Sequence, residues 1–355
     1  MTQNKDISWL WGMRGIAIIC VVLYHWFCFF SAGVCGLAVR ASAQGAHTFF
    51  ILSAFGLYFS LSQNKNRIDK KWFIRRLVKV LFPYYLAVLI VCVSIVIYGI
   101  LIADVPLALR QFDLNAGSFW ATMLLYRSFM DQYLFTINTA WWFVITILQF
   151  YLLFPLICYV YQRLPEKVFL LAALFINLFY QYFYSVAFDL HSAVYSKLFP
   201  AYLFEYSVGI YLSDLYVRDN AKFNALTLGV WPFAIGLILR SCGMWLALNG
   251  RVGYAFNNVF TSIGFFLIAY NIYIWMSYST SFKACCGWLG KNAFSIFLLH
   301  ESFIVIIFNL LKGAHPSPLA MSFLLMAYLC FILPVCFLFQ KFLVDRNIFI
   351  DRKYA

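Results

Sequence analysis

The sequence predicts an all-α integral membrane protein in which about ten transmembrane helices cross the bilayer. Hydrophobic residues occupy 64% of its 355 positions and charged residues only 11%, whereas soluble domains contain about 25% charged residues. Apolar segments of about 20 residues, the length needed to span a bilayer, recur along the whole chain. The charge deficit and the recurring apolar segments together indicate that lipid surrounds most of this protein.

Ten segments are predicted to span the membrane, and no extramembrane domain is visible between them. Their approximate limits are 8–30, 46–63, 75–103, 139–162, 168–186, 198–217, 226–247, 254–277, 288–311 and 319–342. Segment 108–131 is shorter and carries four charged residues: Arg110, Asp113, Arg127 and Asp131. We interpret it as an interfacial or re-entrant piece, although it could be a span. We expect a single transmembrane domain over residues 1–355.

The distribution of basic residues predicts the orientation. An even number of spans puts both termini on one side, and a cytoplasmic N-terminus puts about three quarters of the 26 Lys and Arg residues in the cytoplasm, as the positive-inside rule requires. We therefore expect cytoplasmic termini and a place in the inner (plasma) membrane. The same rule accounts for the net charge of +13, so we expect contact with membrane lipid and no nucleic-acid partner.

Two ionisable residues, Arg14 and His25, lie inside the first apolar segment, WGMRGIAIICVVLYHW. Ionisable side chains in a membrane helix are costly, which makes them candidate functional residues. They are eleven positions apart, so helical geometry puts them on one face, about 16 Å apart along the axis. The predicted orientation puts Arg14 near the cytoplasmic surface and His25 deep in the membrane. The simpler alternative is that Arg14 reaches lipid headgroups and His25 forms one interhelical hydrogen bond.

A cytoplasmic run, NKNRIDKKWFIRRLVKVLFPYY, is rich in Lys and Arg and leads into an apolar helix that contains Pro83. Arg75, Arg76 and Lys79 enter this helix within about one turn. They could therefore point at one anionic group, such as a phosphate. The alternative is a loop that sets the topology and touches anionic lipid.

A second intramembrane histidine, His300, lies in the segment LGKNAFSIFLLHESF. It follows the start of its span by about 18 Å, a depth similar to that of His25. The two histidines, with Glu301 and Ser295 nearby, could line one buried polar cavity. An isolated interhelical hydrogen bond is the alternative for His300.

Glu205, Gln149 and Trp142 are three further candidates for substrate contacts. Glu205 lies in the apolar helix LFEYSVGIYL, so it should be paired or protonated; Arg240 is a conceivable partner, and a hydrated interfacial glutamate is the alternative. In TAWWFVITILQFYLLFPL, Gln149 is a polar group in mid-helix. Trp141 and Trp142 are typical of an interfacial aromatic belt. Cysteines and histidines do not occur at metal-ligand spacing, so we expect no metal.

Together these motifs resemble the acyltransferase-3 family of membrane O-acyltransferases, over most of the chain. Arg14 and His25 match its R-x10-H signature, and GAHTFFILSAFGLYFS is similar to its G-V-D-x-F-F-x-L-S-G-F segment. FIRRLVKVLFPYYL, WWFVITILQFYLLFPL and LGKNAFSIFLLH resemble three more of its segments, in the family's order. The chain departs from the usual residues at four positions: His47 for aspartate, Ala54 for glycine, Lys79 for the second arginine of R-x-x-R, and Ile147 for glutamate.

The resemblance implies transfer of an acyl group, commonly acetyl, from cytoplasmic acyl-CoA to a hydroxyl of a cell-surface or lipid-linked carbohydrate. It implies that Arg14 and the basic run hold the phosphates of acyl-CoA. His25 would act as a general base or transiently carry the acyl group, and His300 would orient the acceptor or stabilise charge. The candidates for acceptor contacts are Glu205, Gln149, Trp142 and Ser295.

Two other classes of function remain as alternatives. A transporter or flippase for a lipid-linked glycan or a small polar solute would use the same polar cavity for passage. The absence of a visible internal repeat weighs against an inverted-repeat transporter. A structural scaffold is disfavoured, because it would not need buried ionisable groups. The identity of the acceptor and the length of the acyl chain cannot be read from the sequence.

Overall fold

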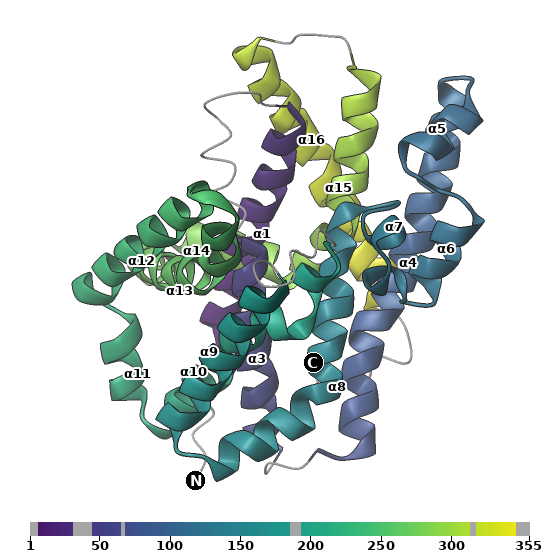
Figure 1. Cartoon of the computed structure of the whole chain (residues 1–355). Helices are drawn as coiled ribbons and strands as arrows, with labels where there is room; N and C mark the ends of the chain where they lie inside the picture. Colours follow the sequence, from purple (N-terminus) through teal and green to yellow (C-terminus); the bar gives the residue numbers. More distant parts are fainter. Residues whose placement is uncertain (1–5, 31–44, 65–67, 185–192, 313–316, 346–355) are drawn as a thin grey trace. The chain divides into compact units, whose positions relative to one another are not determined.

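The computed structural model describes residues 6–30, 45–64, 68–184, 193–312 and 317–345. These residues form helices and their connections, with no β-strand among them (Figure 1). Eight helices in the described part are long and apolar enough to cross a membrane, so the predicted all-α membrane fold is confirmed. Both termini lie outside the described residues, and the orientation stays a prediction.

The eight candidate spans coincide with eight of the ten predicted segments. They correspond to α1 (Ser8–Phe30), α3 (Gly45–Gln63), α4 (Lys70–Leu101), α8 (Trp142–Arg163), α12 (Val230–Leu248), α13 (Gly250–Met276), α15 (Ala293–Leu310) and α16 (Pro318–Leu338). The other two segments form α9 (Glu166–Tyr182) and α10 (Leu203–Arg218), which have only 17 and 16 residues. The last two residues of predicted segment 168–186 lie outside the described part. The predicted number of ten spans is therefore not confirmed.

The predicted interfacial segment 108–131 is broken into short helices. It runs through α5 (Val105–Gln111), α6 (Ala116–Met123) and the 3-10 turn η1 (Arg127–Phe129), with α7 (Asp131–Leu134) following. Asn115 caps α6 by accepting the Ser118 N–H at 3.0 Å, and Asp113 and Leu125 have positive φ angles that reverse the chain. None of these helices exceeds 8 residues, so the alternative interpretation as a span is wrong.

The chain packs into two compact units, and helices α1 and α8 contribute to both. Unit 1 contains residues 1–21, 40–68 and 152–293, and unit 2 contains residues 22–39, 69–151 and 294–355. Unit 1 therefore holds the first part of α1, α3, the last part of α8 and α9 to α14, which include α11 (Asn220–Thr227) and α14 (Thr280–Lys291). Unit 2 holds the last part of α1, α4 to α7, the first part of α8, α15 and α16. The expectation of one domain stays a prediction.

Glycines allow the helices of unit 1 to approach one another closely. A Cβ atom added to Gly209 of α10 would lie 2.3 Å from the carbonyl oxygen of Ile51 in α3. A Cβ atom at Gly264 of α13 would lie 2.7 Å from the backbone nitrogen of Arg240 in α12. Small residues of this kind are typical of contacts between membrane helices, because they let backbones meet.

Unit 2 is built around long helices with defined ends. Asp69 caps α4 by accepting the Trp72 N–H at 2.6 Å, so the basic residues lie in the first turns of this helix. The 3-10 turn η2 (Thr139–Trp141) leads directly into α8. At the other end of the chain, α16 continues into a π-helical turn, η6 (Phe339–Val344). These ends determine where the polar residues of the unit lie.

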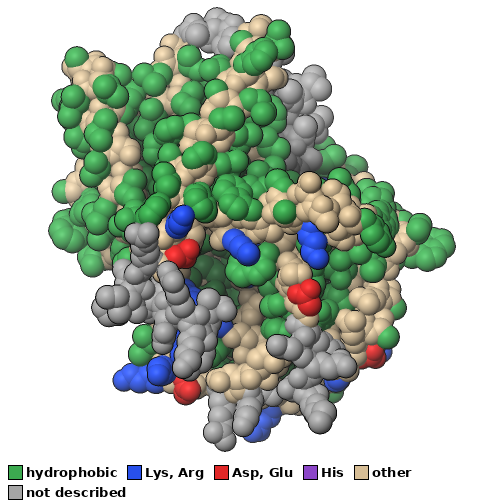
Figure 2. All heavy atoms as spheres, turned by 180° about the vertical axis from the view of Figure 1, so that it is seen from behind, with side chains coloured by type: hydrophobic (Ala, Val, Ile, Leu, Met, Phe, Trp, Pro, Cys, Tyr) green, Lys and Arg blue, Asp and Glu red, His purple; other side chains and the backbone are tan. Residues whose placement is uncertain are grey.

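The surface of the molecule is strongly apolar. Figure 2 shows one face, on which hydrophobic side chains predominate and charged side chains are few. Many large hydrophobic side chains are exposed, including Leu101 and Trp231, at 79% and 80% of their area. Exposure of this extent is expected where lipid replaces water.

Candidate active site

Two histidines from distant parts of the sequence meet in unit 2. Nδ1 of His25, in α1, lies 3.1 Å from Nε2 of His300, in α15. Their ring centroids are 4.9 Å apart, with an angle of 65° between the ring planes. His300 is completely buried and His25 is half-buried. The structure thus brings together the two residues that the sequence places at one depth.

The surroundings of His300 define which nitrogen of each ring carries a hydrogen. Nδ1 of His300 lies 2.9 Å from the carbonyl oxygen of Ile296 and 3.0 Å from that of Phe297. Carbonyl oxygens only accept hydrogen bonds, so this nitrogen must be protonated. In the neutral pair, Nε2 of His300 is then an acceptor, and Nδ1–H of His25 donates to it. Nε2 of His25 is consequently the unprotonated, basic nitrogen.

The residue after His300 anchors α15 to the start of α8. Glu301 is buried and accepts hydrogen bonds from the hydroxyl of Thr139 and, at 2.6 Å, from the N–H of Ala140. Asn138 donates to the hydroxyl of Ser302 at 2.8 Å. These contacts fix the turn η2 beside the histidine pair.

Two aromatic side chains complete this anchoring of α15. The indole N–H of Trp141 donates to the carbonyl oxygen of Leu298 at 2.9 Å. On the other side, the hydroxyl of Tyr328, in α16, donates to the carbonyl oxygen of His300 at 2.7 Å. Trp141 is completely buried, so the predicted membership of an interfacial belt is wrong for this residue. It joins two helices in the interior of the unit.

A buried arginine organises the connection that leads into η2. One terminal nitrogen of Arg127 donates to the carbonyl oxygens of Leu134, Thr136 and Asn138 at 2.7 to 2.8 Å. Its guanidinium also lies 5.7 Å from the centre of the Trp141 ring. Burial lowers the pKa of Arg127, and interactions with the Tyr84 hydroxyl and the Glu301 carboxylate act in the opposite direction. Sequence analysis missed this role, although an arginine between apolar residues in FWATMLLYRSFM is a signal.

Arg14, the other residue of the R-x10-H pattern, lies in unit 1 on the same helix as His25. Its side chain is half-buried, and its guanidinium carbon is 4.9 Å from the centre of the Trp11 ring. A Cβ atom added to Gly56 of α3 would lie 3.2 Å from a terminal nitrogen of Arg14. Glycine at position 56 therefore leaves the space that this guanidinium occupies.

The basic residues predicted to bind a phosphate lie at the start of α4 in unit 2. Arg75, Arg76 and Lys79 are all half-buried, and the guanidinium of Arg76 lies 5.4 Å from the centre of the Trp72 ring. Lys79 is repelled electrostatically by both arginines. Because an anion would relieve this repulsion, the group is a suitable contact for phosphates.

The four predicted substrate residues have different surroundings. Ser295 is buried and donates its hydroxyl to Gln340 of η6. Trp142 and Gln149 are half-buried in α8, where the Trp142 ring packs against Phe143 with centroids 6.1 Å apart. Glu205 belongs to unit 1 and is completely buried in α10. Ser295 thus has a partner that the sequence did not predict.

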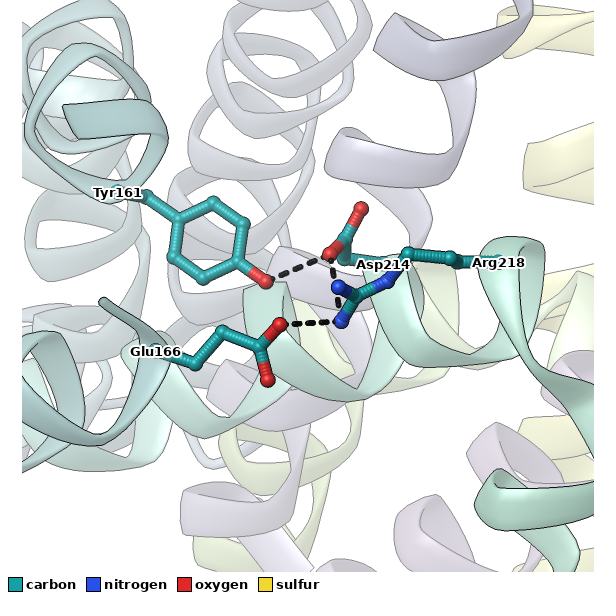
Figure 3. Close-up of polar contacts among 4 residues, drawn as sticks. All are labelled: Tyr161, Glu166, Asp214 and Arg218. Atoms are coloured by element: carbon teal, nitrogen blue, oxygen red, sulfur yellow. Dashed lines mark hydrogen bonds and ion pairs between the residues drawn. The ribbon is translucent and has the colours of Figure 1, made fainter. Parts of the chain in front are cut away.

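A further polar cluster in unit 1 was not predicted from the sequence (Figure 3). The Tyr161 hydroxyl donates to Asp214 at 2.8 Å, and Arg218 lies between Asp214, at 3.4 Å, and Glu166. The cluster links the end of α8 and the start of α9 to α10. Arg218 is 53% exposed, and exposed ion pairs contribute about 0 to 1 kcal/mol, so its contribution to stability is small.

The described residues thus form a helical membrane protein whose interior holds a hydrogen-bonded histidine pair. The model of the acyltransferase-3 family, described as an acyltransferase domain, matches residues 7–341, nearly the whole chain. The chain therefore belongs to this family, and the protein is a membrane acyltransferase. No curated protein and no solved structure matches the chain. Among the described residues, no three His, Cys, Asp or Glu side chains gather as metal ligands.

Proposed function

We propose that this protein moves an acyl group, commonly acetyl, from acyl-CoA to a hydroxyl of a cell-surface or lipid-linked carbohydrate. We place it in the inner (plasma) membrane, with cytoplasmic termini and a cytoplasmic donor. Membership of the acyltransferase-3 family supports an acyltransferase. The observation that carries the proposed chemistry is the pair of His25 and His300, whose nitrogens are 3.1 Å apart.

In the proposed reaction, His25 is the general base. Its unprotonated Nε2 takes the proton of the acceptor hydroxyl while the hydroxyl oxygen attacks the thioester carbonyl carbon. The carbon–sulfur bond then breaks, and the departing CoA thiolate takes up that proton from Nε2 of His25, which regenerates the base. His300 accepts the Nδ1–H of His25 throughout, so it acts as a positioning residue and stabilises the imidazolium that forms. Transient attachment of the acyl group to Nε2 is the alternative route, and rapid quenching would trap that acyl-enzyme.

The cations of unit 2 are proposed to contact the phosphates of the donor. Arg75, Arg76 and Lys79 are half-buried and mutually repulsive, which favours an anionic ligand. Arg14, in unit 1, is proposed as a further donor contact. Arg76→Ala is expected to raise the KM for acetyl-CoA severalfold with little change in kcat. An unchanged KM would leave this group with a purely topological role.

Acceptor contacts are proposed for Gln149, Trp142 and Glu205. These combine a polar amide, an aromatic ring and a carboxyl group, which are side chains that can contact hydroxyl groups and sugar rings. Ser295 was predicted in the same role, but its hydroxyl donates to Gln340. We therefore propose that Ser295 supports α15 instead of contacting the acceptor.

The proposed function is tested by the ester content of cellular glycans. Mass spectrometry of cells with and without this protein reports the reaction, the acyl mass and the acceptor in one measurement. We expect an ester on a glycan only when the protein is present. Identical ester content in both samples would contradict the proposed function.

A transporter or flippase is the alternative function, and it would not need to bind acyl-CoA. Thermal denaturation of the purified protein with and without acetyl-CoA separates the two, because a ligand that binds only the native state stabilises it. We expect a higher melting temperature with acetyl-CoA and no change with an equal concentration of acetate. Absence of stabilisation by acetyl-CoA would favour the transporter.

A further inference from the structure

Glu205 presents an unusual buried carboxyl group in unit 1. It lies in the first turn of α10 with no exposed surface, and neither carboxylate oxygen has a hydrogen-bond partner among the described residues. Arg240, the partner considered from the sequence, lies instead against the ring of Phe265, at 5.4 Å. A buried carboxyl group without partners is costly, so it calls for an explanation.

His47 of α3 presents a second buried atom of the same kind. Its Nδ1 is buried and has no hydrogen-bond partner among the described residues. The His47 ring packs against Tyr202, with centroids 5.1 Å apart, and lies within electrostatic range of Lys197. A histidine also stands here in place of the aspartate that is usual in the family segment. The polar nitrogen is therefore held among packed side chains.

Ring contacts show that α3 and α10 run in parallel. Tyr202, at the start of α10, packs on Phe50 with centroids 4.6 Å apart, whereas Tyr216, near its end, packs on Phe55 and Phe59 at 5.7 and 6.4 Å. Residue numbers thus increase in the same direction along both helices.

This register places His47 and Glu205 opposite each other. The two backbones touch where Gly209 meets Ile51. Residues four positions apart lie on the same face of a helix, about one turn from each other. Glu205 precedes Gly209 by four positions, and His47 precedes Ile51 by four positions. Both unpartnered groups therefore face the same level of the contact between α3 and α10.

From this juxtaposition we propose that His47 and Glu205 form a site that binds a hydroxyl group of a carbohydrate. A hydroxyl can form a hydrogen bond with the Glu205 carboxyl group while its oxygen accepts the N–H of His47, which gives both groups a partner at once. A divalent cation would need more oxygen ligands, and the described residues contain no cluster of three metal-binding side chains.

This inference rests on the proposed function in one respect, the choice of a carbohydrate as the source of the hydroxyl. It assigns the site a role in acceptor affinity, separate from the acyl-transfer step. His47→Ala and Glu205→Gln should therefore weaken binding of the acceptor and leave binding of the donor unchanged. Glu205→Gln preserves the size of the side chain, so it serves where His47→Ala fails to fold.

The experiment measures binding of methyl glycosides to the full-length protein in lipid nanodiscs, without acyl-CoA. The probes are the methyl glycosides of glucose, galactose, mannose and N-acetylglucosamine. We expect wild type to bind at least one, and both variants to bind it about tenfold more weakly, the effect of one lost hydrogen bond. Stabilisation by acetyl-CoA should stay the same in all three proteins. Ser207→Ala is the matched control, because its buried hydroxyl also lacks a partner among the described residues but lies about 200° around α10.

Two outcomes overturn the inference. Either wild type binds none of the four glycosides, or the variants bind as tightly as wild type, which would leave the two groups bridged by water alone. The proposed function fails separately. If glycoside binding depends on His47 and Glu205 but no acyl transfer occurs, the proposed binding site is confirmed and the proposed acyltransferase function is wrong. If acyl transfer occurs and both variants have the wild-type KM for the acceptor, the proposed function is confirmed and the proposed binding site is wrong.

Discussion

Two buried polar pairs in this protein differ in how their hydrogen bonds are satisfied. In unit 2, His300 has defined partners on both ring nitrogens, and Glu301 beside it accepts two hydrogen bonds. In unit 1, Nδ1 of His47 and both carboxylate oxygens of Glu205 lack partners among the described residues. The difference fits the two proposed roles: a group proposed to move a proton has its orientation set by the protein, whereas the groups proposed to bind a ligand have hydrogen-bonding capacity left for it.

The largest expected effect is that of removing the base. His25→Ala should lower kcat for acyl transfer by about 10³-fold, within the range attributed to general bases, and leave the amount of protein in the membrane unchanged. Transfer of labelled acetyl from acetyl-CoA to glycan measures this change. Transfer at the wild-type rate by His25→Ala would exclude it as the base.

Removing the positioning histidine should have the next largest effect. His300→Ala leaves the Nδ1–H of His25 without its acceptor, so we expect kcat to fall by about 10²-fold with little change in KM. His300→Gln carries an amide oxygen that can accept the same hydrogen bond, and it should recover part of the rate. Equal rates for the Ala and Gln variants would show that His300 does not act through this hydrogen bond.

The Glu301→Ala variant separates an effect on stability from an effect on the reaction. Glu301→Ala removes the acceptor of the Thr139 and Ala140 hydrogen bonds, so we expect a loss of about 1 to 3 kcal/mol in stability. Thermal denaturation in nanodiscs measures the loss. The KM for acetyl-CoA should not change, since Glu301 is not proposed to touch the donor. A melting temperature equal to that of wild type would mean that these contacts do not hold η2 in place.

The smallest effect is expected at the exposed cluster of Figure 3. Arg218→Met removes the ion pairs with Glu166 and Asp214, yet the arginine is 53% exposed, so stability should fall by less than about 1 kcal/mol. The same denaturation experiment, compared directly with Glu301→Ala, gives the result. A loss as large as that of Glu301→Ala would show that burial does not govern the strength of these contacts.

The sequence was sufficient for the fold class and for the histidine pair. Apolar segments of membrane length are a strong local pattern, and they predicted the eight long helices directly. The similar depths of His25 and His300 followed from helical rise alone. Two of the predicted spans, α9 and α10, turned out to have only 17 and 16 residues. A 3-10 turn, Phe199–Tyr202, takes up the start of the apolar stretch that contains α10.

Other parts of the site could not be predicted, because they depend on contacts between segments far apart in the chain. Arg127 binds carbonyl oxygens of a turn whose course no local pattern reveals. Trp141 has the composition of an interfacial residue but is buried against α15. The pairing of Ser295 with Gln340 joins residues 45 positions apart. The depth of a side chain in the membrane can be counted along its helix from the sequence, whereas its hydrogen-bond partners on other segments cannot.

The central claim is that Nε2 of His25 is the unprotonated nitrogen, because His300 accepts the hydrogen on Nδ1. Solid-state NMR of the protein labelled with ¹⁵N-histidine in lipid bilayers measures this directly, since protonated and unprotonated ring nitrogens have distinct shifts. The chain has only 5 histidines, and His25→Gln assigns the signal. We expect a protonated Nδ1 and an unprotonated Nε2 for His25, and a mixture of tautomers in His300→Ala. A protonated Nε2 on neutral His25 in the wild type would contradict it.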